Sequence, residues 1–394
     1  MCKQKHVTLF ERYKNNLEKK LSTHFDQNRR PLLGYPSNQK GMEKLSEIYG
    51  VLSKYPVPNN IGNPFDPDKG HYQDHSLHTE KQLLIKLLQT WGGNGTGYCT
   101  QGGTEGNFAG LSLGMSRFGG KTTKENSKSD CVLLYSDSAH YSVPKFVNIS
   151  KAKNKVLHTN KNGEIDYLHF DQCIKESNGS PLVILATLGT TVKGAIDNLD
   201  QLWMILKRYE YTHKNVHIHL DAAFFGGYWG LDKSMPKYTL GKDFHSLSVS
   251  SLKWFGGVIG GYFAQANNIP PLQFESVEYL AGMNDHTISG SRNGFISVIW
   301  SARLLQFDWM QEFEYCVKLR DYLIKRLTDR GIEAWCNPYS LIVVFPMKSD
   351  EIIYRHFQLA SEFNQHINQH ISHVVILPHV TLESLDALVD AVSS

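Results

Sequence analysis

Four short apolar runs of the sequence are each followed by a polar side chain that could take part in chemistry. The runs are residues 131–135, 182–186, 216–220 and 247–249. The side chains that follow them are His140, Thr190, Asp221 and Lys253. Short apolar runs spaced by longer connections predict βαβ units and a mostly parallel sheet. Because ligands of such sheets bind beyond the carboxyl ends of the strands, we expect the four side chains to converge.

A glycine-rich segment, residues 91–106, is expected to form a loop that leads into a helix. Its end reads QGGTEGN from Gln101. Free N–H groups at the start of a helix favour a phosphate there. No Gly-Lys-Ser/Thr follows and the GxGxxG spacing is missing, so this is neither a nucleotide P-loop nor a dinucleotide fingerprint. Taken alone, the segment also fits a tight turn that binds nothing.

Three of the polar side chains have a structural alternative beside the chemical one. Asp221 suits either a helix cap or a partner for a cationic ring nitrogen of a cofactor. Lys253 suits either an ammonium that reaches water or an amine of depressed pKa that forms a Schiff base. His140 suits a core histidine, a base or a ring stacked on an aromatic ligand. Together with the phosphate loop, however, they make up the set that pyridoxal phosphate requires.

The chain resembles the pyridoxal-phosphate-dependent group II amino-acid decarboxylases, in the branch with bacterial histidine decarboxylase and plant serine decarboxylase. The segments that carry the resemblance run in family order: GYPSN at Gly34, GYCTQGGTEGN at Gly97, SAHYSVPK at Ser138, LGTTVKGAIDNLD at Leu188, HIHLDAA at His217, SVSSLKWFGG at Ser248, HTISGSRNG at His286 and NPYSLIVVFP at Asn337. The resemblance implies an α/β fold of the fold type I class. It also implies decarboxylation of an L-amino acid to its primary amine and carbon dioxide.

The same resemblance implies a role for the residues around the cofactor ring. Lys253 would form the Schiff base with the cofactor, and His140 would stack on the pyridine ring. Asp221 would pair with the ring nitrogen, and Ala223 would pack beneath the ring. Thr190 lies on the segment that usually flanks the ring substituents.

The phosphate and the substrate have candidates of their own. Gly103, Thr104 and Ser250 would hold the phosphate. Tyr35, together with His140, would line the substrate pocket. By the resemblance, Tyr279 lies on the segment where relatives place residues that reach a neighbouring active site. It is therefore a candidate catalytic proton donor, and its alternative is an ordinary surface tyrosine. One position departs from the family, since a histidine usually precedes the lysine and Leu252 stands here.

Other reactions stay open at this point. Transamination or C–C cleavage on the same fold, and a non-catalytic protein that binds the cofactor, are the alternatives to decarboxylation. The amino-acid substrate itself is not determined, because one sequence does not locate the pocket positions that distinguish amino acids.

Composition excludes several other classes of function. The 394 residues include 41 basic and 38 acidic ones, and this net charge of +3 gives no argument for nucleic acid. No run approaches the ~20 apolar residues of a membrane span. The six cysteines form no CxxC pair, which indicates reduced thiols in a cytoplasmic protein. His71, His75 and His78 lack further ligands nearby, so no metal is expected.

The order of the patterns predicts three parts. They are an N-terminal arm, a large cofactor-binding domain and a small α/β C-terminal domain, at residues 1–74, 75–300 and 301–394. The small domain is expected to follow a helical pattern over 296–330. By the resemblance, the arm would wrap a partner subunit, which implies a homodimer with shared active sites.

Overall fold

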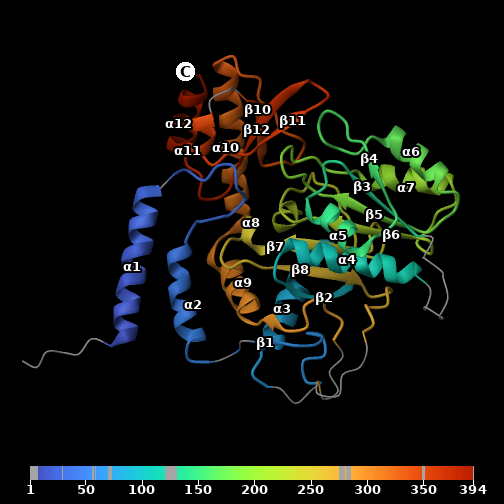
Figure 1. Ribbon diagram of the computed structural model, residues 1–394, viewed down its shortest axis with the longest axis horizontal. Coiled ribbons are helices and arrows are strands. Elements are labelled where there is room, and N and C mark those ends of the chain that lie inside the picture. The colour runs from blue at the N-terminus through green and yellow to red at the C-terminus, as the bar shows by residue number, and fades with distance from the viewer. Residues whose placement is uncertain are drawn as a thin grey trace, which may run out of the picture.

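The computed structural model contains two main sheets that lie in different parts of the molecule (Figure 1). The residues it describes are 8–28, 30–55, 57, 59–69, 73–119, 131–274, 280, 285–347 and 351–393. No helix among the described residues is long and apolar enough to cross a membrane. The seven-stranded sheet falls within 75–300 and the three-stranded sheet within 301–394, although the domain boundaries themselves stay a prediction.

The large sheet has the strand order β2-β8-β7-β6-β5-β3-β4. Its strands are β2 (Gly95–Thr100), β3 (Val132–Ser136), β4 (Asn154–Leu157), β5 (Leu182–Thr187), β6 (Val216–Asp221), β7 (Ser246–Ser250) and β8 (Gly261–Ala266). The run from β7 to β4 is parallel, and β8 pairs in the antiparallel sense with both of its neighbours, β2 and β7. The four strands expected from the apolar runs are β3, β5, β6 and β7, and the mostly parallel α/β fold is confirmed.

The interpretation of residues 91–106 as one loop was wrong. A short 3-10 helix (Gln89–Trp91) is followed by β2, which pairs with β8 along its length. The glycines of β2 made the sequence look like a loop. In the structure they allow the backbone of β2 to pack closely against the backbone of β8. A Cβ on Gly97 would lie 2.0 Å from the carbonyl oxygen of Phe263. Side chains are excluded there because the backbones of the two strands leave no room.

Helices cover both faces of the large sheet (Figure 1). On one face, α4 (Gly103–Phe118) and α5 (Ser142–Ser150) pack on Leu133, Val183 and Leu185. On the other, α6 (Tyr167–Glu176) and α7 (Leu199–Arg208) pack on the side chains that alternate with these. This alternation follows from the two-residue period of a strand, and it buries the sheet on both sides.

One helix is held unusually close to the sheet. Gly106, Gly110 and Gly114 form a stripe on α4 at spacings of four residues, so they share one face. A Cβ on Gly110 would lie 2.0 Å from Nδ1 of His219, which stands on β6. The stripe therefore lets α4 approach β6 and β7 and brings its N-terminus to the carboxyl edge of the sheet.

The small C-terminal sheet is antiparallel and has the order β10-β12-β11. Its elements are α10 (Trp309–Asp329), β10 (Ile342–Pro346), α11 (Glu351–His356), β11 (Ser361–Asn364), β12 (Gln369–Val375) and α12 (Leu382–Ser393). The single helical pattern over 296–330 is in fact two helices, α9 (Phe295–Gln306) and α10. The chain breaks between them because the Asp308 side chain caps α10, accepting the N–H groups of Met310 and Gln311.

The N-terminal segment contributes helices and one short strand. They are α1 (Leu9–Asn28), a 3-10 turn (Met42–Lys44), α2 (Leu45–Leu52) and β1 (Asn59–Asn60), which pairs with β9 (Arg292–Asn293). Two further helices, α3 (Leu77–Leu88) and α8 (Ser251–Trp254), fall within residues 75–300. Figure 1 shows α1 at the edge of the molecule, beyond α2. Its apolar side chains are open to solvent, from 86% for Leu9 to 41% for Leu17.

Candidate active site

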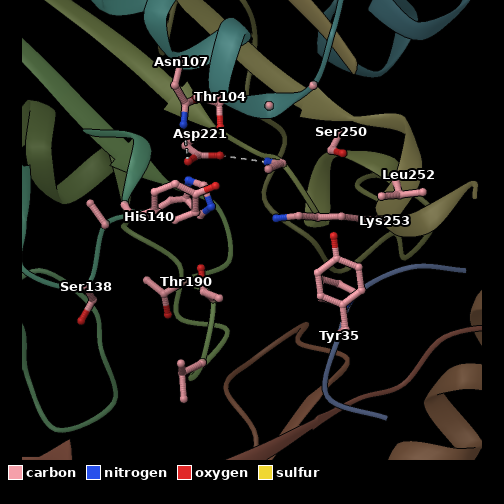
Figure 2. A pocket seen from close by; sticks show the side chains of 18 of the residues that line it. Tyr35, Thr104, Asn107, Ser138, His140, Thr190, Asp221, Ser250, Leu252 and Lys253 are labelled. Atoms are coloured by element: carbon pink, nitrogen blue, oxygen red, sulfur yellow. Dashed lines mark hydrogen bonds between the residues drawn. The ribbon is translucent and has the colours of Figure 1, made fainter. Parts of the chain in front are cut away.

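A cavity of about 940 Å³ opens at the carboxyl edge of the parallel strands (Figure 2). Among the residues that line it are the predicted Tyr35, Gly103, Thr104, His140, Thr190, Asp221, Ala223, Ser250 and Lys253. The expected convergence of the four strand-exit side chains is therefore what the structure contains. Tyr279 lies outside the described residues. The role of each side chain stays a prediction.

The carboxylate of Asp221 has an N–H donor on each oxygen. Its Oδ2 accepts from Nδ2 of Asn107 at 2.8 Å, and its Oδ1 accepts from the backbone N–H of Ala223 at 3.1 Å. The contact with the N–H of Ala223 resembles the helix cap that was the structural alternative for Asp221. The contact with Asn107 comes from helix α4. Because Asp221 is buried, two donors stabilise the ionised form that a cationic ring nitrogen would need.

The same amide of Asn107 also reaches the histidine. Its Nδ2 donates to Oγ of Ser142 at 2.9 Å, and Ser142 Oγ lies 2.9 Å from Nδ1 of His140. The backbone N–H of Ser142 also donates to this nitrogen, at 3.3 Å. Nδ1 is therefore the acceptor, which assigns the proton to Nε2 in the neutral ring. Burial lowers the pKa of His140, Asp221 raises it and Lys253 lowers it further.

Behind Asn107, two histidines of β6 continue the chain of hydrogen bonds. Oδ1 of Asn107 accepts from Nε2 of His219 at 3.1 Å, since an amide oxygen has no proton to give. Nδ1 of His219 then accepts from the hydroxyl of Ser246, and that hydroxyl accepts from Nε2 of His217, both at 2.9 Å. Every donor in this series points toward Asp221. Both ring nitrogens of His219 are hydrogen-bonded, whereas His217 is bonded through Nε2 alone and its buried Nδ1 has no partner among the described residues.

Lys253 follows β7 on the short helix α8, and its side chain extends into the cavity beside Tyr35 (Figure 2). Burial lowers the pKa of its ammonium, and the carboxylate of Asp221 raises it in part. A lysine that loses its proton more easily is a better nucleophile. The alternative of an ammonium extended to bulk water does not fit this placement.

A residue of the N-terminal arm fixes the turn that carries the lysine. The backbone N–H of Asn38 donates to the carbonyl of Lys253 at 3.2 Å, and its Nδ2 donates to that of Trp254 at 2.7 Å. Gly256 is in the left-handed region, with φ of 74°, and a Cβ there would lie 2.2 Å from the Asn38 carbonyl oxygen. The GYPSN segment therefore packs directly on the lysine segment.

The N-terminus of α4 has the form of a phosphate cradle. No side chain caps the helix at Gly102, so its first N–H groups keep their capacity for a ligand. A Cβ on Gly103 would come to 3.5 Å from Cβ of Ala223, so a side chain there would fill the space between helix and sheet. With Asp221, His140 and Lys253 around the same cavity, the residues present fit pyridoxal phosphate.

Thr190 and Leu252, the two other positions named from the sequence, also lie at the cavity. The Thr190 hydroxyl accepts the N–H of Ala195 at 2.9 Å, which closes its loop, and the residue lines the cavity. Leu252 also lines the cavity, and its backbone carbonyl accepts from the N–H of Asn38 at 3.4 Å.

Comparison with known proteins decides the family. The model of the pyridoxal-dependent decarboxylase conserved domain matches residues 82–263. A histidine decarboxylase of Mesorhizobium japonicum is 30% identical over 91% of this chain and 98% of its own length. Serine decarboxylase 3 of Oryza sativa subsp. japonica is 32% identical over 84% of this chain and 72% of its own. The chain belongs to the pyridoxal-dependent decarboxylase family.

Solved structures agree with the fold of this decarboxylase. The internal aldimine form of L-methionine decarboxylase from Streptomyces sp. 590 has a TM-score of 0.83 at 20% identity, over 100% of this chain and 97% of that one. The glutamate decarboxylase of Lactobacillus brevis has a TM-score of 0.76 at 18% identity, over 100% and 93%. At these identities the likeness shows the fold alone.

Motif reasoning missed three residues of the decarboxylase's site, namely Asn38, Asn107 and Ser142. Each lies inside a segment that carried the resemblance, so a signal was present in GYPSN, GYCTQGGTEGN and SAHYSVPK. The sequence did not reveal their contacts. Asn38 and Asn107 act on residues of other segments, and Ser142, which contacts His140 within its own segment, receives its hydrogen bond from Asn107.

Proposed function

We propose that this decarboxylase converts an L-amino acid to its primary amine and carbon dioxide with the residues of the cavity described above. The observation that carries the proposal is the placement of Lys253 and Asp221 on one cavity, with both oxygens of the carboxylate held by N–H donors. When bound, pyridoxal phosphate supplies a ring that takes up the electron pair left by the departing carboxylate.

The chain's own groups would hold and orient that cofactor. Lys253 would supply the amine that binds it covalently, and Asp221 would keep a proton on the ring nitrogen. His140 would lie against the ring, with its Nε2–H available to the substrate side. The start of α4 at Gly103, with the Thr104 and Ser250 side chains, would bind the phosphate.

Orientation of the substrate then selects the bond that breaks. The bond to the carboxylate must stand perpendicular to the cofactor ring for its electrons to enter the ring, so positioning matters more than a strong acid or base. Tyr35 and His140, which line the same cavity as Lys253, are the residues we propose for this task. Tyr279 remains the proposed donor of the proton that Cα receives.

Two measurements test the proposal. The purified protein, loaded with pyridoxal phosphate, is incubated with each common L-amino acid, and carbon dioxide and primary amine are assayed. A keto acid in place of carbon dioxide would indicate transamination. Borohydride reduction and peptide mapping should place the cofactor adduct on Lys253, and an unmodified Lys253 would contradict the proposal.

We also propose a homodimer in the cytoplasm. Support for the dimer comes from α1, whose apolar side chains Leu9, Phe10 and Tyr13 are 64% or more exposed and need a covering surface. The cysteines of the described residues are free thiols, as in a reducing compartment. Light scattering of the full chain should give twice its mass, and removal of residues 1–28 should lower the dimer's stability. A monomeric full chain at micromolar concentration would refute the dimer.

A further inference from the structure

The side of the cavity formed by the small domain carries a charged pair that the cofactor residues do not use. Glu362 on β11 lines the cavity, and its Oε1 lies 2.9 Å from Nζ of Lys193. Lys193 also lines the cavity, three residues after Thr190 on the loop that follows β5. The pair therefore connects the strand-exit loop near the cofactor residues with the sheet of the small domain.

The two members of this pair differ in what they present to the cavity. The Lys193 side chain is 7% exposed and the Glu362 side chain 34%. Two contacts fix the position of Lys193. Its carbonyl accepts from Nδ2 of Asn337 at 2.8 Å, and Gly163 packs so closely on its side chain that a Cβ there would lie 3.0 Å from Cδ of the lysine. Oε2 of Glu362 has no hydrogen-bond partner within the described part of the chain. A ligand consequently meets the carboxylate first.

Among the described lining residues, the other charges of the cavity supply no free cation for an acidic ligand. Its acidic lining residues within the described ranges are Glu105, Asp137, Asp221 and Glu362, and its basic ones are Lys193 and Lys253. No arginine is among the described lining residues. Lys193 is paired with Glu362, and Lys253 is committed to the cofactor.

The histidine on the small-domain side of the cavity does not add a positive charge to the lining. His373 lines the cavity from β12, which belongs to the same sheet as Glu362 on β11. Burial lowers its pKa to about 4, with a hydrogen bond to Gly34 acting in the opposite direction. It is therefore neutral at pH 7. A substrate side chain with a negative charge would be buried without a partner, which costs free energy.

We propose that Glu362, anchored by Lys193, determines which amino acid this decarboxylase accepts. It receives the far end of the substrate side chain and selects side chains that end in an N–H or O–H donor, whether hydroxyl, imidazole or ammonium. This inference rests on the proposed function, since it assigns the substrate class of the same cavity. It assigns no role in the chemical step to the pair, which acts through binding.

The test compares substrate rankings of the loaded enzyme. The panel holds L-serine, L-histidine and L-lysine as donors, L-aspartate and L-glutamate as acids, and L-methionine and L-leucine as apolar side chains. We expect the unaltered enzyme to prefer a donor substrate and to reject the acids. In Glu362→Gln, kcat/KM for that donor substrate should fall about tenfold to a hundredfold, mainly through KM, as expected for loss of a hydrogen bond to a charged group.

The same variant has a second expected result. Lys193 then lacks its carboxylate partner, so kcat/KM for L-aspartate or L-glutamate should rise at least about tenfold relative to the donor substrate. Glu362→Asp keeps the charge and should retain the original ranking. The matched control is Glu176→Gln, which breaks the surface pair with Lys155 at 2.8 Å and should leave every ratio unchanged.

The outcomes separate the inference from the function beneath it. Decarboxylation by all variants with one unchanged ranking would overturn the inference and leave the proposed function in place. A preference of the unaltered enzyme for acidic substrates would do the same. If no amino acid is decarboxylated and Lys253 takes no cofactor adduct, the proposed function fails and the inference fails with it. Cofactor absorbance of each variant shows that the site has folded.

Discussion

Nδ2 of Asn107 donates to Oδ2 of Asp221 at 2.8 Å, and this one amide joins the carboxylate to the rest of the site. Its second proton goes to Ser142 and thereby sets the tautomer of His140, and its oxygen is held by His219. The orientation of the amide is therefore fixed on three sides. A single side chain on α4 aligns the two groups that we propose to contact the cofactor ring.

Replacing Asn107 by alanine should weaken cofactor binding. The change leaves Oδ2 of Asp221 and Nε2 of His219 without partners in the core, and losing a hydrogen bond to a charged group costs about 1.5–3 kcal/mol. The dissociation constant for pyridoxal phosphate, from absorbance titration, should rise about tenfold to a hundredfold. Asn154→Ala, which removes a contact to Ala152 at the edge strand, is the control. An unchanged constant in Asn107→Ala would refute the role.

Lys253→Ala should remove activity while leaving the fold intact. The variant lacks the amine that we propose to bind the cofactor covalently, so kcat should fall at least about thousandfold. The protein without cofactor should unfold no more easily, because the lost ammonium was one whose pKa burial had already lowered. Carbon dioxide release and thermal unfolding check the two parts. Lys242→Ala, at an exposed lysine, should retain full turnover, and full turnover by Lys253→Ala would be incompatible with the mechanism.

Stability of the cofactor-free protein should fall as the pH drops from 7 to 5. Burial lowers the pKa of His219 and His373 to about 4 and that of His245 to about 3, and it lowers that of His217 well below its usual range. The unfolded chain then binds protons below pH 6.5 that the folded chain refuses, so each histidine removes up to about 1.4 kcal/mol per pH unit. Burial raises the pKa of Asp197 to about 7, which acts in the opposite direction but for one group only.

Urea unfolding at several pH values measures this slope. His219→Gln should reduce it by up to about 1.4 kcal/mol per pH unit, because one of the four groups no longer titrates. A free energy of unfolding that is constant between pH 7 and 5 would contradict the assignment of these histidines as neutral.

Adding one methyl group to α4 should destabilise the protein. In Gly110→Ala the new Cβ would meet the ring of His219 at 2.0 Å, and overpacking of this kind costs about 1–3 kcal/mol. Gly50→Ala is the matched control on α2, where a Cβ meets nothing within 4 Å. Helix propensity should make that change stabilising by up to about 1 kcal/mol. Equal shifts of the two melting temperatures would show that α4 is not seated on the sheet by its glycines.

The sequence predicted the central parallel strands of the large sheet, but it did not predict strand β2 or the break between α9 and α10. Runs such as 182–186 are apolar throughout because strands of a parallel sheet are buried on both faces, and this signal is local. Strand β2 was not predicted because it is rich in glycine. These glycines are explained by close contact with β8, which lies far along the chain. The break between α9 and α10 has a local cause. Asp308 caps α10 through the N–H groups two and three residues further on, and it interrupts a pattern that is otherwise helical on both sides.

By itself, the sequence predicted that four strand-exit side chains meet at one site, and it indicated the family to which the chain belongs. Parallel strands end at one edge, so His140, Asp221 and Lys253 had to come together whatever the details of packing. Only the tertiary structure decided how they are held and what the far wall of the cavity contains. The bonds of Asn107 and the pair of Lys193 with Glu362 join distant segments, and such contacts depend on side-chain directions that no local pattern encodes.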